Sequence, residues 1–327
     1  MPRLIITLDA LRHNLALMHE RCRLAGAECM FVFKEAPLHP GLVADVMQGT
    51  SVHRLGLVAW PHAALPAIQG VEIHHVYAPS SMLAQQNASC DCVFINSLFT
   101  LHTLTHIDSG KKPHLRLTLE AGDGRDGVLP EEIPDLCATI RHLDFHLRGL
   151  SVNFACLSSE APTTASLLFA VEQLQRVRTC VSPDIDLSVG GTDVLELAEH
   201  ASLPSDIQEI RCGTGITLGL YPLSGRAIPD ARQDAFRLEA QILECRVKHS
   251  RRLALFDVGT FHTAPEKLLP PLPGMTFAGS SSAYSSFDVT DCPETLREGM
   301  TLSFRLDYHA LSRSLSSQAL PFTRNDA

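Results

Sequence analysis

Lys34 is the side chain in this sequence whose type and position point most directly to chemistry. It ends an apolar run over residues 30–34 and is followed at once by a loop that holds Pro37 and Pro40. An amine at the C-terminal end of a buried strand is desolvated, which disfavours the ammonium form and favours a Schiff-base nucleophile. The alternative is a lysine that merely leaves the sheet and reaches solvent. The rest of the sequence must decide between a Schiff-base lysine and a solvent-exposed one.

Other polar or glycine-rich segments also follow apolar runs. Each of these runs is β-like, and each polar group comes at or just after its end. The groups are Arg125 in a glycine-rich turn, Asn153, the segment Gly190-Gly191-Thr192, Arg211, and the segment Gly213-Thr214-Gly215. A glycine pair alone is an ordinary turn signal, and Thr192 could simply cap a helix. Their repetition at the ends of successive β runs is the stronger signal.

The elements that must position these residues alternate between short β runs and helical patterns. The expected strands cover residues 29–34, 54–59, 75–78, 91–96, 114–119, 147–154, 184–189 and 208–212. Helical periodicity fills the gaps, for example over 130–142 and 164–179. Eight βα units over about two hundred residues predict a (β/α)8 barrel of the TIM type. An open doubly wound sheet is the competing architecture.

The pattern changes after about residue 229, where β-like runs occur without long helices. These runs cover 236–247, 253–258, 275–278, 285–289 and 301–308. We therefore expect a barrel domain over residues 1–228 and a smaller C-terminal β domain over 229–327. Residues 7–9 are expected to add a strand to the β domain, and the tail after Leu320 is expected to be disordered.

The polar groups converge because barrel enzymes place their chemistry at the C-terminal ends of the strands. Glycine loops after the seventh and eighth strands are typical phosphate sites, where backbone N–H groups bind the anion. An amine, a phosphate cradle and a partner for a ring nitrogen are what pyridoxal 5'-phosphate (PLP) requires. The conjunction of Lys34, two such loops and two arginines therefore indicates a PLP site.

Several motifs in order along the chain carry a family resemblance. They are residues 31–34 (FVFK), 122–127 (GDGRDG), 149–153 (GLSVN), 188–192 (SVGGT), 210–213 (IRCG), 234–240 (DAFRLEA), 287–291 (FDVTD) and 304–311 (FRLDYHAL). With these motifs the chain resembles the fold-type III PLP enzymes, and within them the ornithine racemase-like amino-acid racemases related to alanine racemase. The resemblance extends over nearly the whole chain.

The resemblance implies a role for each motif residue. Lys34 would bind the cofactor covalently and serve as one acid/base group, with Arg125 near the cofactor phenolic oxygen or the substrate carboxylate. The residues expected to bind the cofactor besides Lys34 are Asn153, Thr192, Arg211, Gly213, Thr214, Gly215 and Tyr308. Arg211 would donate to the pyridine nitrogen and leave it unprotonated, because arginine is not a useful acid near neutral pH. Such a site suits removal and return of the Cα proton better than transamination.

Racemisation needs an acid/base group on each face of the substrate, and the second one is less evident. Relatives take a tyrosine from the β domain of a partner subunit, but residues 244–252 run straight into the next strand without one. Tyr284 is the candidate, with Asp257 and His262 as weaker ones. We expect an amino-acid racemase that acts as a homodimer on a free, basic amino acid such as ornithine. The alternatives are a PLP homeostasis or regulatory protein, an inactive paralogue, or another PLP reaction such as decarboxylation.

Charge and cysteine content indicate which classes of protein the sequence does not fit. A formal net charge of -9 argues against a general nucleic-acid surface, and no secretory signal or membrane-length apolar stretch opens the chain. Ten scattered cysteines without a CxxC pair are typical of a reduced, cytoplasmic protein and do not predict a zinc site. The histidines include the adjacent pair His74/His75 and the i,i+4 pair His102/His106. For helical i,i+4 histidines a solvated helix face is more consistent with the sequence than a metal site.

Overall fold

The computed structural model describes residues 1–35, 38–58, 68–77, 90–106 and 112–325. The chain divides into two compact units. One unit holds residues 15–216 and 221–228, and the other holds residues 1–14, 217–220 and 229–327. Within the described part of the chain, no helix combines the length and the apolar character needed to cross a membrane.

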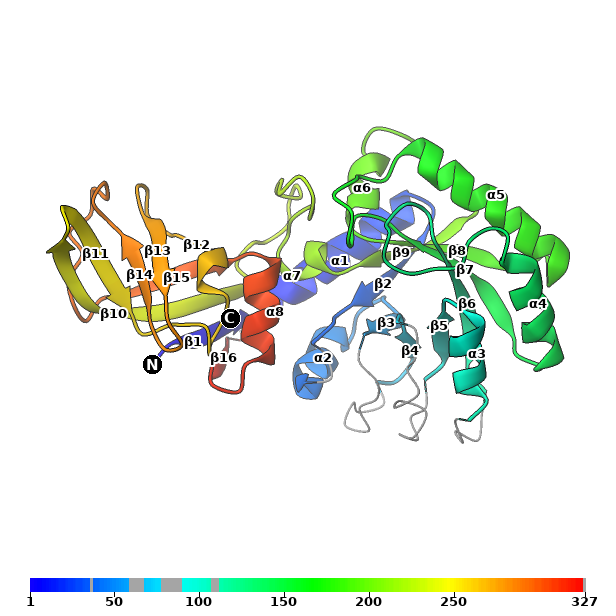
Figure 1. Cartoon of the computed structure of the whole chain (residues 1–327), viewed down its shortest axis with the longest axis horizontal. Helices are drawn as coiled ribbons and strands as arrows, with labels where there is room; N and C mark the ends of the chain where they lie inside the picture. Colours follow the sequence, from blue (N-terminus) through cyan, green and yellow to red (C-terminus); the bar gives the residue numbers. More distant parts are fainter. Residues whose placement is uncertain (36–37, 59–67, 78–89, 107–111, 326–327) are drawn as a thin grey trace. The chain divides into compact units, whose positions relative to one another are not determined.

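The first unit is built on a closed barrel of parallel strands, as the sequence predicts (Figure 1). In order around the barrel, the strands are β2 (Glu28–Val32), β3 (Arg54–Leu57), β4 (Glu72–His75), β5 (Cys92–Ile95), β6 (His114–Leu119), β7 (Leu147–Asn153), β8 (Asp186–Gly190) and β9 (Ile207–Cys212). Strand β2 pairs with both β3 and β9, which closes the ring. The carboxyl ends of all eight strands therefore share one end of the barrel.

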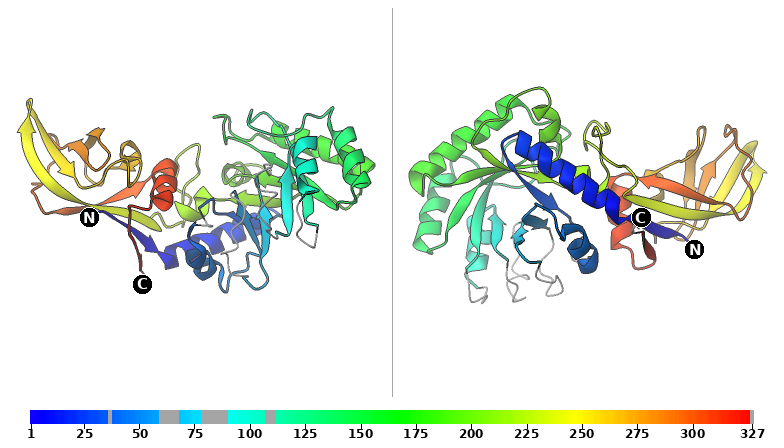
Figure 2. Two further views of the ribbon diagram at one scale, coloured as in Figure 1. Left: turned by 60° about the horizontal axis from the view of Figure 1, so that its bottom comes forward. Right: turned by 180° about the vertical axis from the view of Figure 1, so that it is seen from behind.

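Helices follow most of these strands. They are α2 (Pro40–Met47), α3 (Leu98–Leu104), α4 (Ile133–His142), α5 (Thr164–Cys180), α6 (Asp193–Ala198) and α7 (Thr214–Thr217), whereas α1 (Leu8–Leu24) precedes β2. Helix α5 shows why the sequence folds this way. Its capping box joins Thr163 and Ser166, and its buried face repeats at helical spacing through Leu167, Ala170 and Leu174. Figure 2 shows α4 and α5 outside the strands, as a barrel requires.

The second unit is an antiparallel sheet with one parallel edge pair. Its strands are β1 (Arg3–Thr7), β10 (Phe236–Lys248), β11 (Arg251–Phe256), β12 (Leu268–Leu269), β13 (Thr276–Ser280), β14 (Ser285–Asp288), β15 (Thr301–Leu306) and β16 (Phe322–Asn325). The order β12-β15-β10-β11-β14-β13 is joined by β1, which pairs with β10. The short helix η3 (Pro265–Lys267) and helix α8 (Tyr308–Ser316) complete the unit. Phe256, Phe287 and Phe304 form its aromatic core, with ring centroids 5.3–5.5 Å apart.

Three expectations about elements are wrong. The strand expected at residues 75–78 lies at Glu72–His75, where His74 and His75 are both buried, and residue 78 lies outside the described residues. The disorder expected after Leu320 does not hold for Phe322–Asn325, which form β16 and pair in parallel with β1. An N-terminal strand does join the sheet of the β domain by pairing with β10, but it spans Arg3–Thr7 and Leu8 already begins α1.

Candidate functional site

Lys34 lies just beyond the carboxyl end of β2. The backbone N–H of Phe33 donates to Gly56 O at 3.2 Å, which continues the β2–β3 ladder to the residue before the lysine. Phe33 is buried and its ring stacks on Phe31, with centroids 5.5 Å apart. Lys34 itself is half-buried. The packed phenylalanines therefore fix the lysine backbone at the active end of a barrel.

Arg211 is the most tightly held polar side chain at this end of the barrel. It is 5% exposed. Its Nη2 donates to Val152 O and to Asn153 Oδ1, both at 2.7 Å, and its Nη1 donates to Ser188 Oγ at 2.6 Å. Burial lowers the pKa of Arg211 to about 10, so the guanidinium remains charged at neutral pH.

Arg211 also explains the glycine at the end of β8. A Cβ on Gly190 would lie 2.6 Å from Arg211 Nη2 and 2.9 Å from Asn153 Oδ1. A side chain there would displace the guanidinium, because real Cβ atoms do not approach so closely. The structure thus brings two predicted residues, Asn153 and Arg211, into direct contact across the ends of β7 and β9.

Thr192 connects the two glycine loops. The backbone N–H of Gly215 donates to Thr192 Oγ1 at 3.2 Å, and Thr192 is 1% exposed. A Cβ on Gly215 would lie 2.6 Å from Thr192 Cγ2, so the loops pack without space for a side chain. Thr192 precedes α6, but its hydroxyl makes no capping hydrogen bond, so the simple N-cap interpretation is wrong. By contrast, a Cβ on Gly191 would meet no atom within 4 Å, so the loop is open there.

Arg125 lies in the loop after β6 and is partly buried. Its Nε donates to Asp126 Oδ1 at 2.7 Å, and its guanidinium lies 5.3 Å from the centroid of the Tyr77 ring. The loop is braced by Asp123, whose Oδ1 accepts from three successive backbone N–H groups, those of residues 156–158. Arg125 is among the charges that act on the pKa of Arg211. It therefore belongs to the same end of the barrel without touching Arg211 directly.

A buried charged network supports Arg211 from inside the barrel, and sequence reasoning missed it. Ser188 Oγ accepts from Arg211 and donates to Glu209 Oε1 at 2.5 Å. Glu209 also accepts from Arg54 Nη1 at 2.9 Å and lies 3.7 Å from Arg116 Nη2. Glu209 and Arg116 are both 0% exposed.

The charges in this network stabilise one another. Burial alone raises the pKa of Glu209, but Arg116, His74 and Arg54 outweigh it and hold the pKa at about 2. One sequence signal was available: Glu209 and Arg211 alternate with apolar residues on β9 and so share one face of the strand. Their partners on other strands gave no comparable signal.

The two predicted tyrosines belong to the other unit. Tyr308 is the first residue of α8, which Asp307 caps, and so does not end a strand as expected. Tyr284 lies in the turn between β13 and β14 and is 47% exposed. The β10–β11 hairpin closes in two residues, His249 and Ser250, which confirms that no tyrosine-bearing segment occurs there.

The weaker candidates for an acid/base group already have partners. Asp257 Oδ1 accepts from the Gln241 backbone N–H at 2.8 Å, and Asp257 Oδ2 lies 3.1 Å from the N-terminal amine. His262 Nδ1 accepts from the Gly259 backbone N–H at 3.1 Å. These contacts give both side chains a structural role, so Tyr284 remains the candidate.

The residues at the barrel end fit a phosphorylated pyridine aldehyde. Lys34 supplies an amine, and the open backbone at Gly191 lies beside the joined loops that carry Thr192 and Gly215. Arg211 keeps donor capacity beyond its three hydrogen bonds, since a guanidinium carries five N–H groups. An amine, an unobstructed glycine loop and a buried cation are the features such a cofactor needs.

Comparisons with known proteins agree with this geometry. The family model described as alanine racemase, N-terminal domain, matches residues 6–222. The chain is 22% identical to ornithine racemase from Acetoanaerobium sticklandii, over 97% of this chain and 98% of that protein. It is also 22% identical to lysine racemase from Thermotoga maritima, over 97% of this chain and 96% of that protein.

Solved structures show the same fold. Alanine racemase from Bartonella henselae, with covalently bound pyridoxal phosphate, superposes with a TM-score of 0.71 and 15% identity, over 99% of both chains. At this identity the likeness establishes the fold alone. The family match covers well over half of the sequence, and the chain belongs to the alanine racemase N-terminal domain family.

Proposed function

We propose that this protein is a PLP-dependent amino-acid racemase. The observation that carries the proposal is the buried Arg211, held by Asn153 and Ser188 at the carboxyl end of a barrel whose two glycine loops are joined by Thr192. Membership of the alanine racemase family supports it, as do two relatives named ornithine racemase and lysine racemase. Pyridoxal phosphate, when bound, acidifies the Cα–H bond of an attached amino acid.

The residues at the barrel end would divide the binding tasks among them. Lys34 would hold the aldehyde carbon covalently. Thr192, Gly213, Thr214 and Gly215 would bind the phosphate. Arg211 would face the pyridine nitrogen, and Asn153 would orient Arg211, to which it is hydrogen-bonded. Arg125 would bind the substrate carboxylate or the phenolic oxygen.

Arg211 also limits the chemistry. Because its pKa stays at about 10, it does not release a proton near neutral pH and cannot protonate a neighbouring nitrogen. A site of this kind favours proton exchange at Cα over transamination. Lys34 would remove or return the proton on one face, and Tyr284 of a second copy would serve the other face. The proposed assembly is therefore a homodimer.

The substrate class follows from the named relatives. Both curated relatives are named for a basic amino acid, so we propose a free basic amino acid such as ornithine or lysine. Purified protein with added PLP should convert L-ornithine or L-lysine to the racemate, and chiral chromatography measures both enantiomers. Incubation in D2O should place deuterium at Cα in both. Cα exchange without inversion would refute racemisation, and no exchange with any basic or neutral amino acid would favour a PLP-binding protein without this activity.

A further inference from the structure

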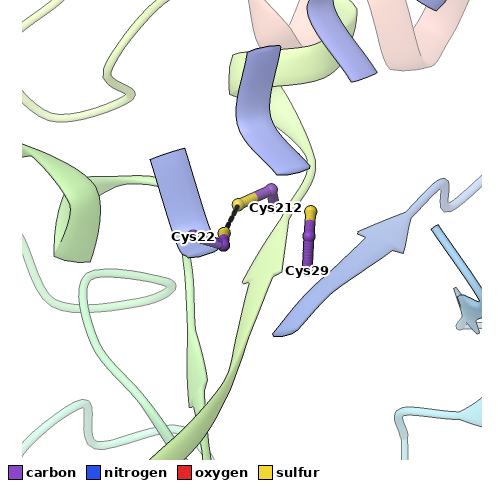
Figure 3. Close-up of side chains that lie close together, drawn as sticks. All are labelled: Cys22, Cys29 and Cys212. Atoms are coloured by element: carbon purple, nitrogen blue, oxygen red, sulfur yellow. Dashed lines mark hydrogen bonds between the residues drawn. The ribbon is translucent and has the colours of Figure 1, made fainter. Parts of the chain in front are cut away.

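Three cysteines from three separate elements meet in the wall of the barrel unit (Figure 3). Cys22 lies in the last turn of α1, Cys29 on β2 and Cys212 at the end of β9. Their sulfur atoms all lie within 4.8 Å of one another, and those of Cys22 and Cys212 are 3.9 Å apart. Each side chain is at most 2% exposed. We refer to these three residues as the cysteine triad.

Strand pairing explains why the triad forms. In the β2–β9 register Cys29 lies opposite Ile210, and Phe31 lies opposite Cys212. Successive side chains on a strand point to opposite faces, so Cys212 points away from the lumen that Arg211 enters. Cys29 and Cys212 thus share the outer face of the wall, where Cys22 of α1 contacts them.

We propose that the cysteine triad is a binding site for a thiophilic d10 metal ion, Zn2+ or Cu+. Thiolates select these ions over harder ones. A zinc–sulfur bond of about 2.3 Å places two ligand sulfurs about 3.8 Å apart at a tetrahedral angle and about 4.0 Å apart in a trigonal plane. The 3.9 Å separation of Cys22 and Cys212 already satisfies this geometry. The remaining pairs, within 4.8 Å, need to close by about 1 Å at most.

Local charge favours an ion at this place. Hydrogen bonds from Cys22 and Cys29 lower the pKa of Cys212, and the Arg211 guanidinium acts in the same direction. The hydrogen bond to Cys212 raises the pKa of Cys22 and of Cys29. Thiols give up their protons when they bind a metal ion, so binding at the triad releases protons. A Zn2+ ion with three thiolates carries one negative charge, which the neighbouring Arg211 offsets.

The position of Cys212 ties the triad to the candidate active site. Cys212 lies between Arg211 and Gly213, and both of these neighbours belong to the proposed cofactor site. An ion that draws Cys212 toward Cys22 and Cys29 would shift the end of β9 and weaken PLP binding. This consequence rests on the proposed function, whereas metal binding itself does not.

The test is a Cd2+ titration of the reduced full-length protein without PLP, followed by the sulfur-to-cadmium charge-transfer absorbance. We expect one tight Cd2+ per chain, release of protons on binding, and competition by Zn2+ or by Cu+ under anaerobic conditions. Whichever competitor displaces Cd2+ at lower concentration identifies the ion. Cys22→Ala should weaken Cd2+ binding by more than about 100-fold, because loss of a direct ligand exceeds the effect of a neighbouring residue.

Cys137→Ala is the matched control, since Cys137 on α4 is also 0% exposed but lies outside the triad. It should bind Cd2+ as the unchanged protein does. If Cys22→Ala does not fold, Cys29→Ser replaces it, and protection of Cys22, Cys29 and Cys212 from alkylation by Cd2+ provides a second readout. Absence of a tight Cd2+ site, its retention in the triad variants, or a Cys22–Cys212 disulfide that persists under the reducing conditions of the titration would overturn the proposal. Loss of racemase activity alone would not affect it.

Discussion

Glu209→Gln is the substitution that most sharply tests the buried network beneath Arg211. It keeps the size of the side chain and removes its charge at a position that is 0% exposed. Arg54, Arg116 and Ser188 all contact this carboxylate. The change therefore removes the counter-charge that the buried Arg116 shares with the partly buried Arg54, and leaves Arg116 with Asp186 as its remaining ion-pair partner.

The expected loss of stability can be estimated in two ways. A fall in the pKa of Glu209 from 4.5 to about 2 corresponds to about 3 kcal/mol, at about 1.4 kcal/mol per pKa unit. Removing one partner of a buried ion pair costs about 3–5 kcal/mol. Both estimates give a decrease in the free energy of unfolding of about 3–5 kcal/mol at pH 7.

The same reasoning fixes the pH dependence. Because the folded-state pKa of Glu209 lies below its unfolded value, the carboxylate stabilises the fold above pH 4.5. That stabilisation is lost as the pH falls from 4.5 toward about 2. The difference between the unchanged protein and Glu209→Gln should therefore be constant from neutral pH down to about pH 5 and shrink below it.

Urea denaturation followed by circular dichroism measures this difference at each pH. Glu28→Gln is the control, because Glu28 lies opposite Glu209 in the β2–β9 register but is exposed. It should change stability by less than about 0.5 kcal/mol. Equal stability of Glu209→Gln and the unchanged protein at pH 7, or a difference that does not vary with pH, would refute the reasoning.

Three further outcomes follow from the site. Thr192→Val removes the hydroxyl that accepts from the Gly215 backbone N–H, and a hydrogen bond of about 1.4 kcal/mol corresponds to about tenfold weaker PLP binding. Absorbance titration measures this affinity, and an unchanged value would contradict the proposed role of Thr192 in binding the phosphate. Arg211→Lys should lose the hydrogen bonds to Ser188 and Asn153. Because burial lowers the pKa of a lysine, the substitution should also add an ionisation to the pH–rate profile. A profile identical to that of the unchanged protein would argue against contact between residue 211 and the cofactor. Tyr284→Phe should slow Cα exchange more from one enantiomer than from the other, measured by deuterium incorporation, and equal slowing would remove Tyr284 from the reaction.

The barrel was predictable because its signals are local. Eight apolar runs alternate with helical patterns, and each run needs only its own residues to be recognised. Register and boundaries were less predictable. The strand at Glu72–His75 was expected three residues later, so its buried His74 lay outside the expected range. Strand β16 was missed because its pairing with β1 joins the two ends of the chain, and no local pattern encodes that contact.

In the candidate site, too, the positions of residues along the chain were more predictable than their contacts. Lys34, Asn153, Thr192 and Arg211 were predictable because each lies at or near a strand end, where polar groups stand out against apolar runs. Their contacts were not predictable. The role of Thr192 in joining two loops depends on Gly215, which is 23 residues away. The cysteine triad was hidden for the same reason, since its members come from three elements and show no metal-binding spacing in the sequence.

Covalent attachment of PLP to Lys34 tests the central claim most directly. The protein is incubated with PLP, its absorbance is recorded, and borohydride reduction is followed by peptide mapping. We expect a yellow protein and one pyridoxyl group, located on Lys34, that is absent from Lys34→Ala. A colourless protein without a modified lysine, or a pyridoxyl group that persists in Lys34→Ala, would contradict the proposed function.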